Sequence, residues 1–288
     1  MQFGLPYGLY HSGRPLSREQ ARDVLAAAWQ GGIDLLDTGA AYGDAEKSIG
    51  ELRPAGARFA VISKTSPLRR HGLGPSEVAE VVDGVRRSVR LLRVRALNGL
   101  LVHHTPDLLA TGGDLLFRAL ENLRAEGLVR RLGVSVYDAA TLKAVLDRFP
   151  VQIVQLPVNL LDQRFVHDGT LALLARSNIE VHARSVFLQG VLLADAAQLP
   201  PRFAGVRGRI ERLDAQCAAR GVSRAAAALR FVASCPGVSR IVIGVNSAAQ
   251  LKENLSAFSV ATAGSWDLDA AAYALDDAEI IDPRKWAA

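Results

Sequence analysis

An acid, a phenol, an amine and an imidazole stand at or just beyond the ends of three consecutive apolar segments of this sequence. The residues are Asp37, Tyr42, Lys64 and the adjacent pair His103 and His104. A tyrosine hydroxyl ordinarily has a pKa near 10, and a nearby ammonium lowers that pKa by stabilising the phenolate. A carboxylate paired with the ammonium keeps it charged, and an imidazole opposite can hydrogen-bond a substrate oxygen. The set therefore suits protonation of a carbonyl oxygen while hydride arrives at the carbonyl carbon.

Each of these residues also has a purely structural interpretation. Asp37 can serve as a strand-end turn or a helix cap, Tyr42 as a packed aromatic, and Lys64 as a surface residue with a buried stem. Either histidine can be a satisfied core residue. The combination is more specific than any member, because all of them are expected at the same end of neighbouring strands.

Seven short segments rich in Val, Ile and Leu are the strands expected to position these groups. They are IDLLDT (33–38), FAVISK (59–64), LNGLLVHH (97–104), RLGVSV (131–136), VQIVQLP (151–157), IEVHAR (179–184) and RIVIGV (240–245). Their apolar residues are consecutive rather than alternating, as in parallel strands that are buried on both faces. An eighth strand is expected near Gln2–Gly4.

Amphipathic segments separate these strands and predict helices. They are Ser17–Gly31, Ser76–Leu92 with Ser76 as the N-cap, Leu115–Glu126, Ala139–Arg148, Thr170–Arg176, Arg209–Arg220, Arg224–Ser234 and Ala248–Phe258. This alternation predicts an α/β fold with a parallel sheet. Eight strands at this length favour a (β/α)8 TIM barrel, whose active site lies at the C-terminal ends of the strands. The competing open sheet lacks support, since neither G-x-G-x-x-G nor G-x-x-x-x-G-K-[ST] occurs.

Composition narrows the class of protein. The chain has 288 residues, a net charge of +5 and two cysteines, Cys217 and Cys235. We expect a single domain over residues 1–288, with 260–288 as a C-terminal tail. No apolar segment is long enough to span a membrane, and the basic residues are dispersed without interleaved aromatics, so neither a membrane nor a nucleic acid is an expected partner. Two cysteines form neither a disulfide framework nor a four-ligand zinc site, so we expect no metal and a cytoplasmic location.

The segment GIDLLDTGAAYGDAEKSIGE (32–51) resembles the signature of the aldo-keto reductase superfamily, a D-T-A-x-x-Y-G-x-x-E pattern after the second barrel strand. Gly39 replaces the usual Ala. Further motifs follow in the order typical of that family: SKT around Lys64, LLVHH around His103, LGVSVY around Ser135, VQLPVNLLDQR around Gln155 and Asn159, ARSVFLQG around Arg184, and IVIGVNSAAQLKENL near the end. The resemblance covers essentially the whole chain.

The resemblance implies a role for each residue of the first group. Tyr42 would be the general acid in carbonyl reduction, Lys64 and Asp37 would tune it, and a histidine would orient the carbonyl. Counting from Asn98, which replaces the family's usual Asp, gives His103, whereas an H-x-P pattern gives His104. We favour His103, because strand register is more rigid than the loop that follows, and period-two alternation then points His104 away.

The resemblance also implies a nicotinamide dinucleotide cofactor. The residues that would hold its carboxamide are Ser135 and Gln155, and those that would line its pyrophosphate are Ser185, Leu188 and Gly190. The residues that would hold its adenosine half are Gly244, Ser247, Gln250, Glu253 and Asn254. Arg184 stands where many relatives carry an aromatic ring stacked on the nicotinamide, and a planar guanidinium can also stack. Val136 replaces an Asn that contacts the carboxamide in many relatives.

We expect NADPH as the coenzyme, with NADH also possible. Relatives that bind the 2′-phosphate of NADPH often carry Arg or Lys beside the Gly244 segment, where this chain has the neutral residues Val245, Asn246 and Gln250. Arg240 and Lys252 keep the surroundings basic. The preference for NADPH should therefore be weakened.

The expected activity is reduction of an aldehyde, ketone or sugar carbonyl, or the reverse oxidation, on a small-molecule carbonyl substrate by a monomer or weak homo-oligomer. Two alternatives stay open: a cofactor-binding regulatory module with little turnover, and a barrel lyase or isomerase whose lysine forms a Schiff base. The segment from Val260 carries six acidic residues against Arg284 and Lys285 in a basic chain. It is either a tail that docks across the basic body and helps wall the pocket or an amphipathic terminal helix without a substrate role.

Overall fold

A computed structural model of the chain describes residues 3–6, 8, 13–264 and 266–286. Its seven strands are β1 (Leu35–Asp37), β2 (Ala60–Lys64), β3 (Gly99–Val102), β4 (Leu132–Ser135), β5 (Ile153–Pro157), β6 (Glu180–Arg184) and β7 (Val238–Ile241). They form one sheet in chain order, and every pair is parallel. The C-terminal ends of all seven strands therefore meet at one rim.

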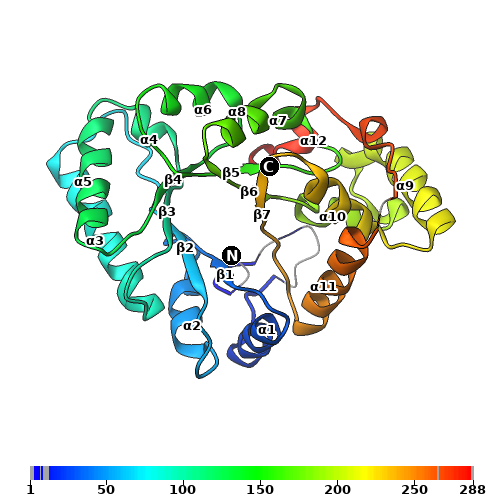
Figure 1. Ribbon diagram of the computed structural model, residues 1–288, viewed down its shortest axis with the longest axis horizontal. Helices are drawn as coiled ribbons and strands as arrows, with labels where there is room; N and C mark the ends of the chain where they lie inside the picture. Colours follow the sequence, from blue (N-terminus) through cyan, green and yellow to red (C-terminus); the bar gives the residue numbers. More distant parts are fainter. Residues whose placement is uncertain (1–2, 7, 9–12, 265, 287–288) are drawn as a thin grey trace.

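Helices surround this curled sheet (Figure 1). The α-helices are α1 (Arg18–Gln30), α2 (Ala45–Leu52), α3 (Pro75–Leu92), α4 (Pro106–Leu109), α5 (Gly113–Ala125), α6 (Ala139–Leu146), α7 (Arg164–His167), α8 (Thr170–Arg176), α9 (Arg207–Arg220), α10 (Arg224–Ser234), α11 (Ala248–Thr262) and α12 (Ala278–Ile281). Short 3₁₀ turns are η1 (Leu188–Leu193), η2 (Ala196–Gln198), η3 (Pro201–Val206), η4 (Ala270–Tyr273) and η5 (Pro283–Lys285). The barrel architecture predicted from the alternation is confirmed.

Capping residues explain two helix starts. Ser17 accepts a hydrogen bond from the backbone N–H of Gln20, and the Gln20 side chain accepts one from the Ser17 N–H, which completes a capping box before α1. In α3 the predicted cap was wrong: Gly74 is the N-cap and Pro75 is the first helical residue, so Ser76 lies inside the helix. Proline at the first helical position loses no hydrogen bond, which explains the earlier start.

Alternation along the strands sorts the side chains between two apolar layers. Val61 and Leu100 pack outward in the main core beneath the helices, whereas Ile62, Leu101 and Ile153 form a separate cluster inside the barrel. All five are at most 1% exposed. Strands buried on both faces were expected from their consecutive apolar residues, and this expectation is confirmed.

Gly99 on β3 allows the interior cluster to pack tightly. A Cβ at this position would stand 2.5 Å from Cδ1 of Ile153 and 2.6 Å from Cδ1 of Ile62. Any larger residue would displace the interior layer on which the rim side chains rest.

Two predicted strands differ from the structure. Of the strand expected at Gln2–Gly4, Gln2 lies outside the described residues, and Phe3 and Gly4 form a turn. The segment 240–245 was expected to be a strand throughout, but β7 ends at Ile241, and only the Val242 N–H continues the ladder, by donating to the Ala183 carbonyl. Among the described strands β7 pairs with β6 alone, and this one-sided pairing explains its early end.

The seam between β1 and β7 is bridged by side chains in the described part of the chain. Arg240 on β7 pairs with Asp34, just before β1, with an N–O distance of 2.8 Å. Outside the seam, α1 packs against α11, and the two helices lie side by side in Figure 1.

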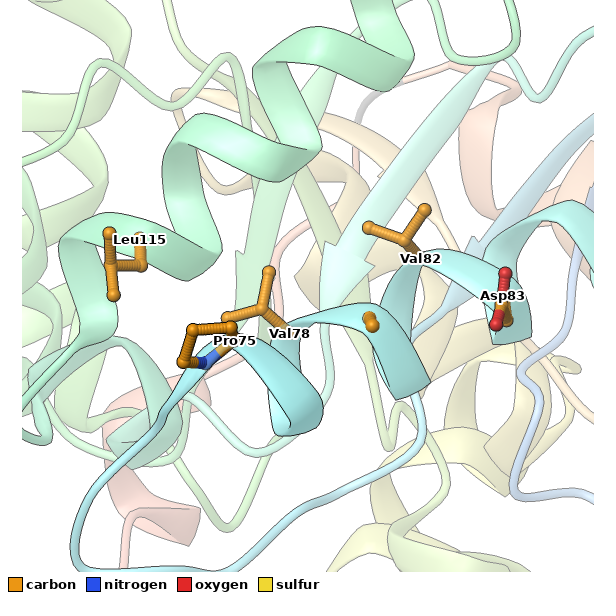
Figure 2. A pocket seen from close by; sticks show the side chains of 6 residues that line it. Pro75, Val78, Val82, Asp83 and Leu115 are labelled. Carbon is orange, nitrogen blue, oxygen red and sulfur yellow. The ribbon is translucent and has the colours of Figure 1, made fainter.

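A shallow apolar groove of about 360 Å³ lies on the outer surface between α3 and α5. Figure 2 shows Pro75, Val78 and Val82 of α3 facing Leu115 of α5, with Asp83 at the side. None of these residues belongs to the predicted site. Among the described residues, no helix is both long and apolar enough to cross a bilayer.

The C-terminal tail docks on the body of the barrel. Gln163 donates from its side-chain amide to the Ala270 carbonyl, and the Leu275 N–H donates to the Leu161 carbonyl. Arg212 on α9 pairs with Asp269 at 3.2 Å. Docking of the tail is thus observed over its described residues, whereas the expectation that the tail also walls the pocket stays a prediction.

Candidate active site

The rim brings together the four side chains selected from the sequence. Lys64 ends β2, Asp37 ends β1, and both lie on the barrel interior, because Asp37 pairs in register with the interior residue Ile62. Tyr42 lies in the loop before α2, and His103 follows β3. Nζ of Lys64 donates to Oδ1 of Asp37 and, at 2.9 Å, to the Thr38 carbonyl.

The phenol faces the imidazole directly, beside this ion pair. The Tyr42 hydroxyl is 3.4 Å from Nε2 of His103, and Nζ of Lys64 is 5.2 Å from the centroid of the Tyr42 ring. A Cβ at Gly39 would stand 3.2 Å from Cβ of Lys64 and 3.3 Å from the Tyr42 ring. The departure from the family pattern at Gly39 thus gives these two side chains room to approach.

Burial determines the ionisation of the phenol and the imidazole. Desolvation and the negative charge of Asp37 raise the pKa of Tyr42, although the charge of Arg184 opposes them. Desolvation and then the positive charges of Lys64 and Arg184 lower the pKa of His103 to about 4. The expectation of a lowered Tyr42 pKa was therefore wrong for this structure, because it counted the ammonium but not the burial of the phenol. At neutral pH both Tyr42 and His103 are uncharged.

The proton of neutral His103 can be assigned from its surroundings. Nδ1 is buried and has no partner among the described groups. An unpaired buried N–H costs more than an unpaired lone pair, so we place the proton on Nε2, where it faces the Tyr42 hydroxyl.

His104 has a structural role. Its Nδ1 lies 2.9 Å from Oδ1 of Asp107, and this buried carboxylate also accepts from the backbone N–H groups of Leu68 and Arg69. The pair fixes the loop after β2 to the start of α4. The geometry thus supports His103 as the histidine of the site.

Lys64 is also buried, with its side chain 1% exposed. Desolvation lowers its pKa, while the charge of Asp37 and its hydrogen bond raise it. Nε2 of Gln155 donates to Oδ2 of Asp37 at 2.8 Å, so both carboxylate oxygens are held. The ion pair is therefore fixed from β1, β2 and β5 together.

A groove of about 290 Å³ runs from these residues to the start of α11. It is lined by Asp37 and Tyr42, and by six of the residues predicted to bind a cofactor: Gln155, Arg184, Ser185, Gly190, Gly244 and Gln250. Gln250 lines its far end, where its side-chain oxygen accepts from the Asn246 N–H. Among the described lining residues the only carboxylate is Asp37, which Lys64 pairs.

The other predicted cofactor residues lie outside the lining of this groove. Ser135 is 5% exposed and Leu188 is fully buried, while Glu253 is exposed and Asn254 is buried on α11. Ser247 caps α11 by accepting from the Gln250 N–H at 3.1 Å. Leu188 also contacts a groove residue, because its backbone N–H donates to the Ser185 carbonyl at 2.8 Å.

The groove wall after β6 has a distorted backbone. Ser185, Leu188 and Gln189 have φ values of 59°, 44° and 53°, and Gly190 has φ 103°. The Asn159 side-chain amide donates to the Ser185 carbonyl at 3.0 Å, which holds this bend. Non-glycine residues in this region are strained, and such strain is typical of functional loops.

Arg184 is held beside the groove by three uncharged partners. Its Nη2 donates to the Val136 carbonyl at 3.0 Å and its Nη1 to the Ser185 hydroxyl at 3.2 Å. Its guanidinium carbon lies 3.9 Å from the centroid of the Tyr137 ring, and that of Arg284, from the tail, lies 3.8 Å from the same centroid. Two guanidiniums at these distances cannot share one face, so the ring lies between them.

The residue-by-residue prediction missed several contributors. Gln189 and Phe187 line the groove, and Tyr137 and Arg284 support Arg184. Glu46, the last residue of the signature motif, is 3% exposed and accepts from the Ser63 hydroxyl at 2.5 Å, next to Lys64. The position of Glu46 in the motif could have identified it from the sequence. No sequence pattern indicates the contact of Arg284 with Tyr137.

Comparison with known proteins agrees with this geometry. The aldo/keto reductase family model matches residues 4–266. D-threo-aldose 1-dehydrogenase from Pseudomonas sp is 30% identical over 295 residues, covering 87% of each chain. Pyridoxal 4-dehydrogenase from Microbacterium luteolum is 29% identical, covering 86% of this chain and 85% of that enzyme.

A solved structure extends the comparison to the fold. An aldo-keto reductase from Klebsiella pneumoniae in complex with NADPH shares 20% identity and a TM-score of 0.69, over 98% of this chain and 99% of that chain. The chain therefore belongs to the aldo/keto reductase family of NAD(P)H-dependent oxidoreductases.

Proposed function

We propose that this protein reduces the carbonyl group of an aldehyde, ketone or sugar with NADPH, and that it can catalyse the reverse oxidation. The observation that carries this proposal is the 3.4 Å approach of Tyr42 to His103 beside the buried Lys64–Asp37 pair, at the head of the groove. The dehydrogenases of sugars and of pyridoxal among the relatives support the same substrate class.

The residues present fit a nicotinamide dinucleotide. We call Asp37, Tyr42, Lys64 and His103 the tetrad. The groove runs from the tetrad to the start of the 15-residue helix α11, and helix N-termini favour phosphate groups. Its only carboxylate among the described lining residues is already paired, and Arg184 adds a positive charge. We propose Gln155, Arg184, Ser185, Gly190, Gly244 and Gln250 as the lining that holds the coenzyme, with Ser135, Leu188, Ser247, Glu253 and Asn254 as a supporting set.

Each residue of the tetrad has a defined task in this proposal. The bound coenzyme supplies hydride to the carbonyl carbon. Tyr42, kept protonated by its raised pKa, gives its proton to the carbonyl oxygen, and His103 donates a hydrogen bond from Nε2 to the same oxygen. Lys64 then stabilises the negative charge on Tyr42, while Asp37 keeps the ammonium in place.

Two residues near the groove support a weak preference for NADPH over NADH. Val245 is buried, and Arg240 is already paired with Asp34. Neither gives a free charge to the groove for a 2′-phosphate, which leaves the exposed Lys252 as the nearby cation. Fluorescence titration with both coenzymes tests this: a preference above about a hundredfold, roughly 2.7 kcal/mol, would contradict it.

An assay of coenzyme oxidation with aldehydes, ketones and sugars tests the function itself. Turnover that is lost in Tyr42→Phe, with coenzyme binding kept, is the expected result. Coenzyme binding without turnover of any carbonyl would favour the regulatory alternative. A lysine adduct trapped by borohydride would favour Schiff-base chemistry, which the burial and double hydrogen bonding of Lys64 oppose.

We further propose that residues 1–288 act as one domain, as a monomer or weak homo-oligomer in the reducing cytoplasm. Cys217 and Cys235 are buried free thiols, and burial raises the pKa of both, which keeps them unreactive. The tail 260–288 is proposed to support the site through the Arg284–Tyr137 contact.

A further inference from the structure

Arg184 places a permanent positive charge on the wall of the groove. Its guanidinium is fixed by a carbonyl, a hydroxyl and an aromatic ring, and none of these partners is charged. Arg284, on the other side of the Tyr137 ring, differs in this respect, because Asp282 binds its guanidinium with both carboxylate oxygens. An arginine does not lose its proton in proteins, so the charge of Arg184 persists through a reaction cycle.

The charge of Arg184 acts on the reacting groups. Arg184 lines the same groove as Tyr42. Its positive charge acts to lower the pKa of Tyr42, His103 and Lys64. Among the described residues that line the groove the only carboxylate is Asp37, whose oxygens accept from Lys64 and Gln155. A ligand next to Tyr42 therefore also meets the field of Arg184.

The position of a hydride donor follows from the positions of the proton donors. The carbonyl oxygen must lie within hydrogen-bond reach of Tyr42 and His103, and the hydride donor must approach the attached carbon to within about 3–3.5 Å. The coenzyme ring must then occupy the groove beside Tyr42, where Arg184 forms part of the wall.

We propose that Arg184 makes this site bind the reduced coenzyme more tightly than the oxidised one. This inference rests on the proposed function. In the reaction a C–H bond of the dihydronicotinamide breaks, its electron pair forms the new C–H bond at the carbonyl carbon, and the Tyr42 proton goes to the oxygen. The coenzyme ring changes from neutral to a charge of +1.

Like-charge repulsion from Arg184 then weakens the binding of the oxidised coenzyme, whereas the binding of the reduced coenzyme, whose ring is neutral, is not weakened. The same positive charge favours the negative charge that develops at the carbonyl oxygen. Arg184 thus selects for entry of reduced coenzyme and for release of oxidised coenzyme, which matches a reductase. Tyr137, which follows β4, stacks on the Arg184 guanidinium, and Arg284 of the tail stacks on the same ring, so both are positioning residues.

The test is equilibrium titration of the full-length protein with NADPH and with NADP⁺, followed by protein fluorescence. For the parent we expect NADPH to bind about tenfold more tightly, equivalent to about 1.4 kcal/mol. Arg184→Met should lower this ratio at least about fivefold, whereas Arg184→Lys, which keeps the charge, should retain it. Arg118→Met removes one charge from the exposed face of α5, away from the tail, and is the matched control.

A parent ratio below about five, or a smaller change than about fivefold in Arg184→Met, would overturn the inference while leaving the carbonyl reductase activity in place. If Arg184→Met does not fold, the same titrations of Arg184→Gln and of the parent test the inference, with the same expected change in the ratio of affinities. A parent that binds neither coenzyme would instead remove the proposed function.

Discussion

Nε2 of His103 lies 3.4 Å from the hydroxyl oxygen of Tyr42, and the two rings meet edge to face with their centroids 5.4 Å apart. They come from different strand ends, and no covalent neighbour forces them together. Two proton-bearing groups that face one position can both bond to a single oxygen atom. This arrangement suits protonation of a carbonyl oxygen at the rim of the barrel.

The two adjacent histidines should respond differently to substitution. His103→Gln should lower kcat by roughly 10² or more, since it replaces a group that bonds the reacting oxygen. His104→Gln should leave kcat within about threefold, because Asp107 keeps its two backbone hydrogen bonds; the matched pair has the same volume change. Steady-state kinetics on both variants decides, and a larger loss in His104→Gln would reverse the assignment.

Stability should fall in acid because of His103. Its pKa is lowered from 6.5 to about 4 in the folded protein, so the unfolded chain takes up this proton first. The contribution of neutral His103 is present above pH 6.5 and is lost as the pH falls to about 4. Urea denaturation at several pH values should give a smaller loss for His103→Gln than for the parent.

The same shift predicts the pH profile of activity. Because His103 is already neutral at pH 6.5, kcat/KM should have no inflection there. A step near pH 6.5 that disappears in His103→Gln would show that the histidine titrates normally, against this account.

The Lys64–Asp37 pair should behave as a coupled unit. Lys64→Met leaves the Asp37 carboxylate without its counter-ion and should lower the free energy of unfolding by about 3 kcal/mol. Adding Asp37→Asn should recover part of this loss, although the double variant stays inactive. Lys143→Met, at an exposed pair, is the control and should change stability by less than about 1 kcal/mol. If the changes in the free energy of unfolding caused by Lys64→Met and by Asp37→Asn were strictly additive in the double variant, the two residues would not be coupled.

Strand ends could be predicted from the sequence because they follow simple rules. Consecutive apolar residues identify buried parallel strands, and parallel strands bring their C-terminal ends to one rim. Asp37, Lys64 and His103 could thus be selected before any coordinates. The strand predicted over 240–245 was wrong for a physical reason. The composition of this segment is that of a buried strand, but β7 pairs only with β6 among the described strands, so β7 ends at Ile241.

Other features depend on contacts that no local pattern encodes. The hydrogen bond from Gln155 to Asp37 joins positions 118 residues apart. The stacking of Arg284 on Tyr137 requires the tail to dock first. The pKa of Tyr42 was expected to fall because an ammonium is near; it rises because the phenol is buried, and burial is a property of the fold.

The most direct test of the account is carbonyl turnover by Tyr42→Phe beside the parent, with Tyr273→Phe, which removes another buried hydroxyl, as the matched control. Coenzyme oxidation and coenzyme Kd are measured for all three proteins. The account predicts a loss of roughly 10² or more in kcat for Tyr42→Phe, an unchanged Kd, and parent-like kinetics for Tyr273→Phe. Equal kcat values in the parent and Tyr42→Phe would contradict it.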